Sequence, residues 1–124
     1  MTVIRGAEAP SFEVPGVTFT ALAAPSRGSA DVCTWRITVA PGLHSEQAHT
    51  LDRDEIFMVT AGALRITPGG ELLRSGDAAV VPAGQPIALV NETGTPAEAY
   101  VAIRAGFTAT MADGTVLGTP PWAS

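Results

Sequence analysis

Hydrophobic and polar residues alternate along several short stretches of the chain. The clearest stretch is 32–39, VCTWRITV, where every second residue is apolar and threonines and an arginine stand between. A period of two, rich in β-branched and aromatic residues, is typical of a strand with one buried face. The same reasoning predicts further strands at 17–22, 55–60, 63–67, 71–74, 78–81, 87–91, 99–105, 108–112 and 115–117.

Turn-forming residues separate these stretches. Pro41-Gly42 follows the clearest strand, and Asp113-Gly114 is the strongest two-residue hairpin signal in the chain. No segment shows the spacing of an amphipathic helix. Short strands that alternate with turns predict an all-β fold, either a sandwich or a barrel.

Composition agrees with one small β domain. Of the 124 residues, 46% are hydrophobic and 15% are charged, which excludes a disordered chain. The 13 glycines and 10 prolines disfavour long helices. No repeat, charge run or linker divides the sequence, so we expect a single domain over 1–124.

Charge and cysteine content limit which binding partners and which cell compartment are expected. The seven basic residues are all arginine, and the net charge is −5. Nucleic acid and anionic membrane surfaces are therefore not expected as partners, and without lysine no Schiff-base chemistry is available. No apolar run reaches the ~18 residues of a membrane span. Cys33 is the single cysteine, which excludes an internal disulfide and favours a cytoplasmic setting.

A motif of regularly spaced residues covers 42–62, GLHSEQAHTLDRDEIFMVTAG. Gly42, His49, Glu55 and Gly62 are its key positions. Its glycines fall where the hydrophobic pattern predicts turns.

A second motif covers 76–91, GDAAVVPAGQPIALVN, with Gly76, Pro82, Gly84 and Asn91 as key positions. Together the two motifs resemble the paired motifs of the cupin superfamily. The resemblance implies a small single-domain cupin, a jelly-roll β-barrel of two antiparallel sheets. It also implies a homodimer, since many cupins are dimeric and exposed strand edges favour pairing.

The same resemblance implies a metal site, and this chain departs from it. Cupins typically hold Fe, Mn, Ni, Cu or Zn with two histidines and a glutamate of the first motif and a histidine of the second. His49 and Glu55 occupy two of these positions, but Leu51 and Ile87 occupy the other two and cannot donate an electron pair. We therefore expect a degenerate metal site and no cofactor. The alternative is a divalent transition metal held by His44, His49 and Glu55.

His49 and Glu55 are the candidate catalytic residues. On a strand that begins at Glu55, this residue and Phe57 share one face. A buried carboxylate is costly unless it is paired, so we expect His49 to contact it, which would raise the histidine pKa. Three interpretations stay open: an ion pair that only satisfies itself, an acid–base pair or polar anchor for a ligand, and the remnant of a metal site.

The substituted positions suggest a pocket. Apolar side chains around a small polar centre are typical of small-molecule sites, although the same residues would also fill the core of a small barrel. The expected pocket residues are Trp35, Leu51, Phe57, Ile87 and Leu89.

The sequence thus predicts a cupin that binds a small molecule without the standard metal. Silent binding and an isomerase- or cyclase-like step both remain open. The alternatives are a metal-dependent oxygenase or isomerase with a non-standard site, and a purely structural or regulatory module. Trp122, which follows Pro120 and Pro121, is expected to pack against the barrel or a partner subunit.

Overall fold

Strands make up nearly all the regular structure of the computed structural model, which describes residues 1–124. Its helical segments are two 3₁₀ turns, η1 (Pro25–Arg27) and η2 (Pro121–Ala123). No helix is long and apolar enough to cross a membrane. The strands are β1 (Ser11–Val14), β2 (Val17–Ala21), β3 (Val32–Val39), β4 (His49–Leu51), β5 (Glu55–Ala61), β6 (Ala63–Leu64), β7 (Leu73–Arg74), β8 (Ala78–Val81), β9 (Ala97–Arg104), β10 (Ala109–Met111) and β11 (Val116–Gly118).

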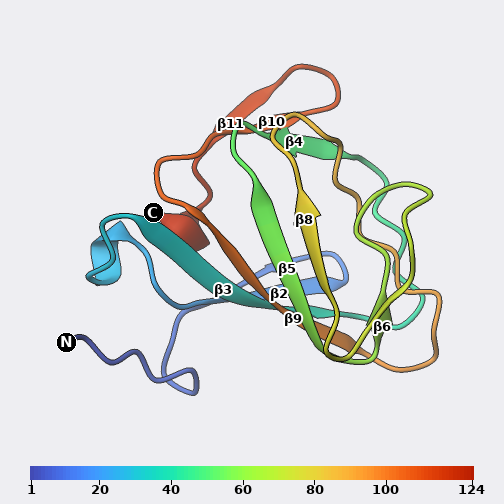
Figure 1. The fold of residues 1–124 in the computed structure, drawn as a ribbon, viewed down its shortest axis with the longest axis horizontal. Coiled ribbons are helices and arrows are strands. Elements are labelled where there is room, and N and C mark those ends of the chain that lie inside the picture. The colour runs from blue at the N-terminus through green and yellow to red at the C-terminus, as the bar shows by residue number, and fades with distance from the viewer.

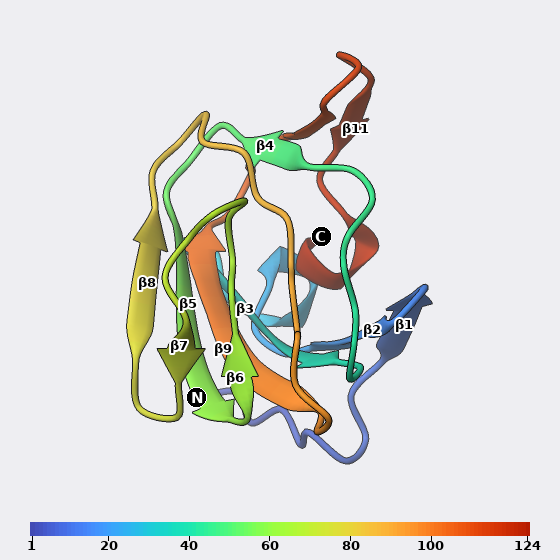
Figure 2. The same cartoon turned by 90° about the vertical axis from the view of Figure 1, so that its right-hand side faces the viewer.

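The strands form antiparallel sheets. Six of them pair in the order β1-β2-β3-β9-β5-β8, and three pair in the order β11-β10-β4. A short hairpin, β6-β7, stands apart. The long strands β3, β5 and β9 cross the middle of the molecule in Figure 1. Figure 2 shows the six-stranded sheet curving round to β2 and β1, with β4 across the interior from it. The fold is therefore all-β with two main antiparallel sheets, as predicted.

Alternation along the central strands creates the core. Every second residue of β3, β5 and β9 is buried, and the residues between face outward. Strand β9 lies between β3 and β5 in register over nearly its whole length, so the three buried faces merge. A cluster of 21 buried residues results.

The predicted strands differ from the structure in several places. Those predicted at 63–67 and 71–74 are only two residues long, β6 and β7. Strand β1 was not predicted, because it lies at the sheet edge and its exposed positions do not alternate with buried ones. Strand β4 has only three residues, two of them polar, and is too short to show a strand pattern in the sequence. The predicted strand at 87–91 forms only isolated bridges, since its backbone bonds alternately to residues 43–49 on one side and to residues 65–66 on the other.

Candidate ligand-binding site

A cavity of about 290 Å³ lies between the two main sheets. Fifteen of the twenty residues that line it are hydrophobic. Three of the lining residues, Val14, Gln47 and Leu117, are exposed, so the cavity opens to solvent beside the β1–β2 and β10–β11 hairpins and the loop before β4. All seven candidate residues from the sequence line this one cavity: Trp35, His49, Leu51, Glu55, Phe57, Ile87 and Leu89.

Glu55 is the buried acid of the cavity. It begins β5, and its backbone lies between Val81 of β8 and Ile103 of β9, so two neighbouring strands fix it. The residue is only 3% exposed, and its carboxyl group makes no hydrogen bond or ion pair within the chain. Burial disfavours the ionised form and raises the pKa of Glu55 to about 8. Near neutral pH the side chain is therefore mainly a protonated, uncharged acid.

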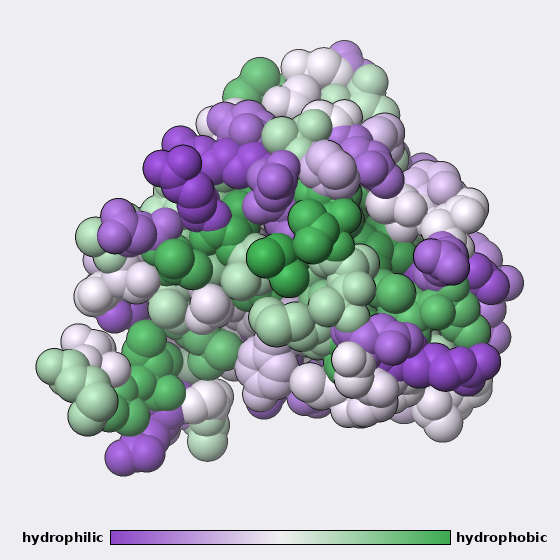
Figure 3. Space-filling view, in the orientation of Figure 1, coloured by the Kyte–Doolittle hydropathy of each residue, from purple (hydrophilic) through white to green (hydrophobic).

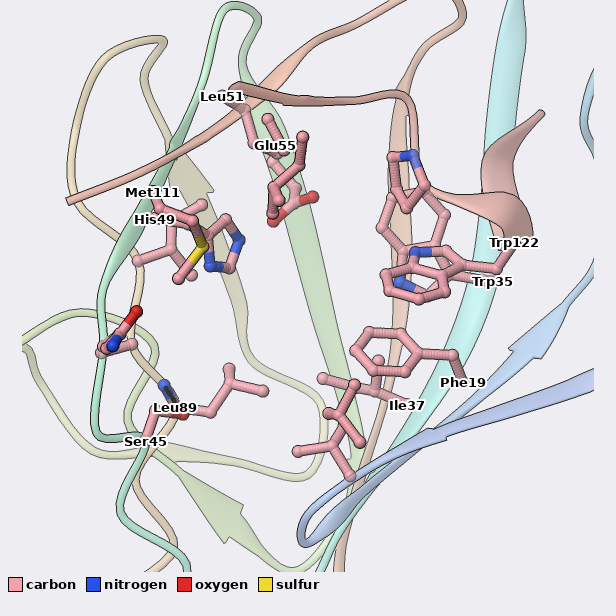
Figure 4. Close-up of a pocket in the computed structure, with 18 of the residues that line it drawn as sticks. Phe19, Trp35, Ile37, Ser45, His49, Leu51, Glu55, Leu89, Met111 and Trp122 are labelled. Carbon is pink, nitrogen blue, oxygen red and sulfur yellow. Dashed lines mark hydrogen bonds between the residues drawn. The ribbon is translucent and has the colours of Figure 1, made fainter. Parts of the chain in front are cut away.

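His49 is the second titratable group of the cavity. It begins β4, where it lies opposite Met111 of β10 and exchanges backbone hydrogen bonds with Ile87. Burial lowers the pKa of His49, so its ring is mainly neutral near neutral pH. Figure 4 shows the His49 and Glu55 side chains in the same part of the cavity.

The expected direct pairing of these two residues is absent. No ion pair or hydrogen bond joins Glu55 to His49, and the pKa of His49 moves down rather than up. Desolvation by burial is the only cause of both pKa shifts, so no attraction between the two groups offsets their burial.

The residues do not fit the metal of the cupin resemblance. Leu51 and Ile87 reach the cavity as hydrocarbon side chains beside His49 and Glu55. His44 is exposed and does not line the cavity, so the alternative ligand set is not brought together. No three His, Cys, Asp or Glu residues gather where they would share an ion. Two donors are fewer than protein metal sites normally use.

An aromatic wall lines one side of the cavity, and three of its residues were not predicted as pocket residues: Phe19, Phe107 and Trp122. Trp122 packs against the barrel, as one of the two expected alternatives, and stacks on Phe19 with ring centroids 3.9 Å apart and planes 14° apart. Trp35 and Phe107 form a second pair at 6.0 Å. Figure 4 shows Phe19, Trp35 and Trp122 on one side of the cavity and His49 on the other.

Backbone contacts hold this wall in place. Arg27 of η1 donates a hydrogen bond to the carbonyl of Trp122 at 3.0 Å, and Cys33 donates one to the carbonyl of Ala123 at 3.3 Å. Phe19 lies on β2 and Trp122 lies about a hundred residues further along the chain. Their proximity depends on the complete fold, and the only sequence signal is the aromatic residue that follows two prolines.

Fold and site together define an all-β domain with an interior cavity and a small polar centre. A family model for the cupin domain matches residues 35–103, more than half of the chain. The protein belongs to the cupin family. A search of curated proteins found no match.

Solved structures agree with this assignment. The polyketide cyclase RemF from Streptomyces resistomycificus is 18% identical, with 84% of this chain and 79% of that chain covered and a TM-score of 0.73. A cupin-superfamily sugar phosphate isomerase from Silicibacter pomeroyi is 26% identical. The alignment covers 89% of this chain and 81% of the isomerase, with a TM-score of 0.66. An acetylacetone dioxygenase from Acinetobacter johnsonii is 13% identical. The alignment covers 98% of this chain and 85% of the dioxygenase, with a TM-score of 0.72. These likenesses establish the fold and leave the activity to be argued from the site.

Proposed function

We propose that this cupin binds an organic small molecule in the cavity, with Glu55 and His49 as polar anchors and without the standard cupin metal. One observation carries the proposal: Glu55 is only 3% exposed and lines an apolar cavity, and its carboxyl oxygens make no hydrogen bond within the chain but stay accessible from the cavity. Native proteins satisfy nearly all their buried polar groups. A ligand that enters the cavity would supply the missing hydrogen bond.

The same pair is suited to proton transfer. A protonated Glu55 has a proton to donate, and a neutral His49 has a ring nitrogen that can accept one. An acid and a base in the same part of one cavity can donate and accept a proton on nearby atoms of a bound molecule, as general acid–base catalysis requires. We therefore propose an isomerase- or cyclase-like step as the reaction class. The similar structures include a cyclase, an isomerase and a dioxygenase, so the reaction class is argued from the site alone.

We also propose that the protein is a cytoplasmic homodimer and does not bind nucleic acid. The single cysteine is buried and unpaired, which suits a reducing compartment. Strand β8 is an edge of the six-stranded sheet and has no partner on its outer side. A second copy of the chain would cover this edge.

Thermal shift against a library of neutral and ionic metabolites tests the binding proposal. Met111→Trp would fill part of the cavity from β10, whereas Val116→Trp changes an exposed position of β11 outside it. Cavity ligands should raise the Tm of wild type and of Val116→Trp, but not that of Met111→Trp.

A second pair of variants tests the anchor. Glu55→Gln should weaken the response to these ligands, and Glu71→Gln, at an exposed position, should not. A library without any stabilising compound, or equal shifts in Met111→Trp and wild type, would contradict binding in the cavity.

A further inference from the structure

The charge of the cavity wall restricts the ligand. Glu55 and His49 are the only titratable residues among those that line it, and no arginine reaches it. A carboxylate, sulfate or phosphate group inside would find no cation to offset its lost hydration. A cationic ligand would find a negative charge only if Glu55, the one acid of the lining, lost its proton against the cost of burial. The lining therefore favours an uncharged molecule.

The shape of the wall restricts the ligand further. Phe19 and Trp122 stack nearly parallel, with planes 14° apart, and Trp35 and Phe107 form a second stacked pair with planes 29° apart. All four rings line the cavity. Aromatic side chains pack on the faces and edges of other flat rings, with a gain beyond area burial. The side of the cavity that Figure 4 shows opposite His49 is thus suited to a planar ring system.

The volume of the cavity and the position of its polar groups also restrict the ligand. A cavity of about 150 Å³ lined by apolar side chains accommodates benzene. The cavity here, about 290 Å³, is roughly twice as large. The Glu55 carboxyl group and the His49 ring lie at one end and can each bond to a ligand atom there, and on the aromatic side the indole N–H of Trp122 is a buried donor without a partner. Two fused rings would match the volume of the cavity, and one oxygen at their end would bond to Glu55 and His49.

We propose that the ligand is an uncharged planar molecule of about two fused rings, with a phenol or ketone oxygen directed at Glu55 and His49. This inference rests on the proposed function and specifies its substrate class. The cavity should reject the carboxylate of the same ring skeleton. It should also discriminate against saturated rings, which do not stack.

Calorimetry near neutral pH with four matched probes tests the proposal. The probes are 2-naphthol, which is neutral and planar, naphthalene without the oxygen, 2-naphthoate with a charge, and 2-decalol with a saturated skeleton. Wild type should bind 2-naphthol at least about tenfold more tightly than each of the other three.

Replacement of the acid tests the hydrogen bond. Glu55→Leu should remove the preference for 2-naphthol over naphthalene while naphthalene still binds, because only the oxygen contact is lost. Glu71→Leu, an exposed control, should keep the preference. If the Glu55→Leu variant does not fold, Glu55→Gln in its place should retain part of the preference, since an amide still donates a hydrogen bond.

The outcomes distinguish this inference from the proposed function. Equal or tighter binding of 2-naphthoate or 2-decalol would overturn the ligand class and leave a binding cavity. Failure of all four probes while a charged library compound binds would do the same. Failure of all four probes together with the whole library would overturn both proposals.

Discussion

At Glu55 and His49, the cost of burial falls on the charged form, with opposite effects on the two pKa values. The carboxyl group of Glu55 keeps its proton up to a pH of about 8, whereas His49 loses its proton below its ordinary pKa of 6.5. Both side chains are therefore uncharged in the same range of pH. An apolar cavity tolerates them for that reason.

Stability should depend on pH through Glu55. The unfolded chain releases this proton near pH 4.5, but the folded chain holds it up to about pH 8. Within that window unfolding releases a proton, so the free energy of unfolding should fall as the pH rises. Glu55→Gln should remove this fall and be more stable than wild type above pH 8, by a few kcal/mol, on the order set by a shift of this size.

Urea unfolding at a series of pH values measures the effect. His49 is present in both proteins, so its own contribution cancels in the comparison. Glu71→Gln, an exposed acid, should follow the wild-type curve. Parallel curves for wild type and Glu55→Gln would contradict the buried, protonated acid.

The titration of His49 should be nearly independent of Glu55. Because Glu55 is protonated wherever His49 titrates, Glu55→Gln removes no charge in that range. NMR titration of the His49 ring should give a pKa below 6.5 in both proteins. A clearly lower pKa in Glu55→Gln would instead indicate an ionised carboxylate beside the ring.

The candidate residues were accessible to sequence reasoning because they lie in motifs or alternate on a strand. Trp35 and Phe57 share the buried faces of β3 and β5, so the period of two placed them inside. The state of ionisation was not accessible in this way. It depends on how far Glu55 lies from any partner, which only the packed structure determines.

Among the elements, two motif glycines have different structural reasons. Gly62 ends β5 with φ +69°, and a Cβ there would lie 2.5 Å from the carbonyl oxygen of Pro96. Gly76 has φ +94°, but a Cβ there would meet nothing within 4 Å. One position requires glycine for conformation and close approach, the other for conformation alone.

Alanine at the two positions should therefore differ in cost. Gly76→Ala should lower the free energy of unfolding by about 1 kcal/mol, the usual penalty of a left-handed conformation. Gly62→Ala should cost at least about twice as much, because the backbone of residues 96–97 must also move. Chemical denaturation of both variants tests the order, and an equal loss would mean that the turn relaxes freely.

The pairing of β4 brings together the positions that hold metal ligands in the cupin resemblance. His49 and Leu51 are two residues apart on β4, and Ile87 is bridged to His49 on the neighbouring segment. All three side chains reach the cavity with Glu55. Two substitutions should therefore be enough to gather four donors in one place.

The variant Leu51→His with Ile87→His should bind Ni²⁺ or Zn²⁺ at least about tenfold more tightly than wild type, as measured by calorimetry. Without metal it should lose about 2–5 kcal/mol of stability, since both replaced residues are buried. Leu51→His with Val80→His, which puts one histidine on the exposed outer face, is the control. Equal affinities for the two double variants would show that position 87 lies outside the donor set.

Strand prediction succeeded where one face is buried and the other is not. Strands β3 and β5 alternate clearly, and the structure confirms them almost to the residue. Residues 87–89 are buried in succession, so an apolar run was correctly assigned to the interior but wrongly to a continuous strand. Edge position and alternating partners are properties of the whole sheet, not of the local sequence.

At the scale of the molecule, the outer face of the six-stranded sheet is partly apolar. Ile56 and Met58 of β5, Val80 of β8 and Tyr100 of β9 are exposed there, and the strand register makes them neighbours. Figure 3 shows hydrophobic residues gathered over the centre of this face. The patch adjoins the free edge of β8, so one partner would cover both.

The dimer prediction follows from this face. Sedimentation equilibrium should give about twice the chain mass of 12.7 kDa for wild type. Met58→Glu should shift the protein to monomer, because two copies of the charge would be buried together. Val116→Glu, exposed on β11 away from the patch, should remain dimeric. A wild-type mass of one chain would contradict the prediction.

The distribution of aromatic residues gives the protein two separate optical reporters. Both tryptophans, Trp35 and Trp122, line the cavity, whereas the only tyrosine, Tyr100, lies on the outer face. Tryptophan emission therefore originates entirely at the cavity wall, and tyrosine emission at the surface proposed to join two subunits. An unlabelled sample should report cavity occupancy and subunit association in different spectral bands of one experiment.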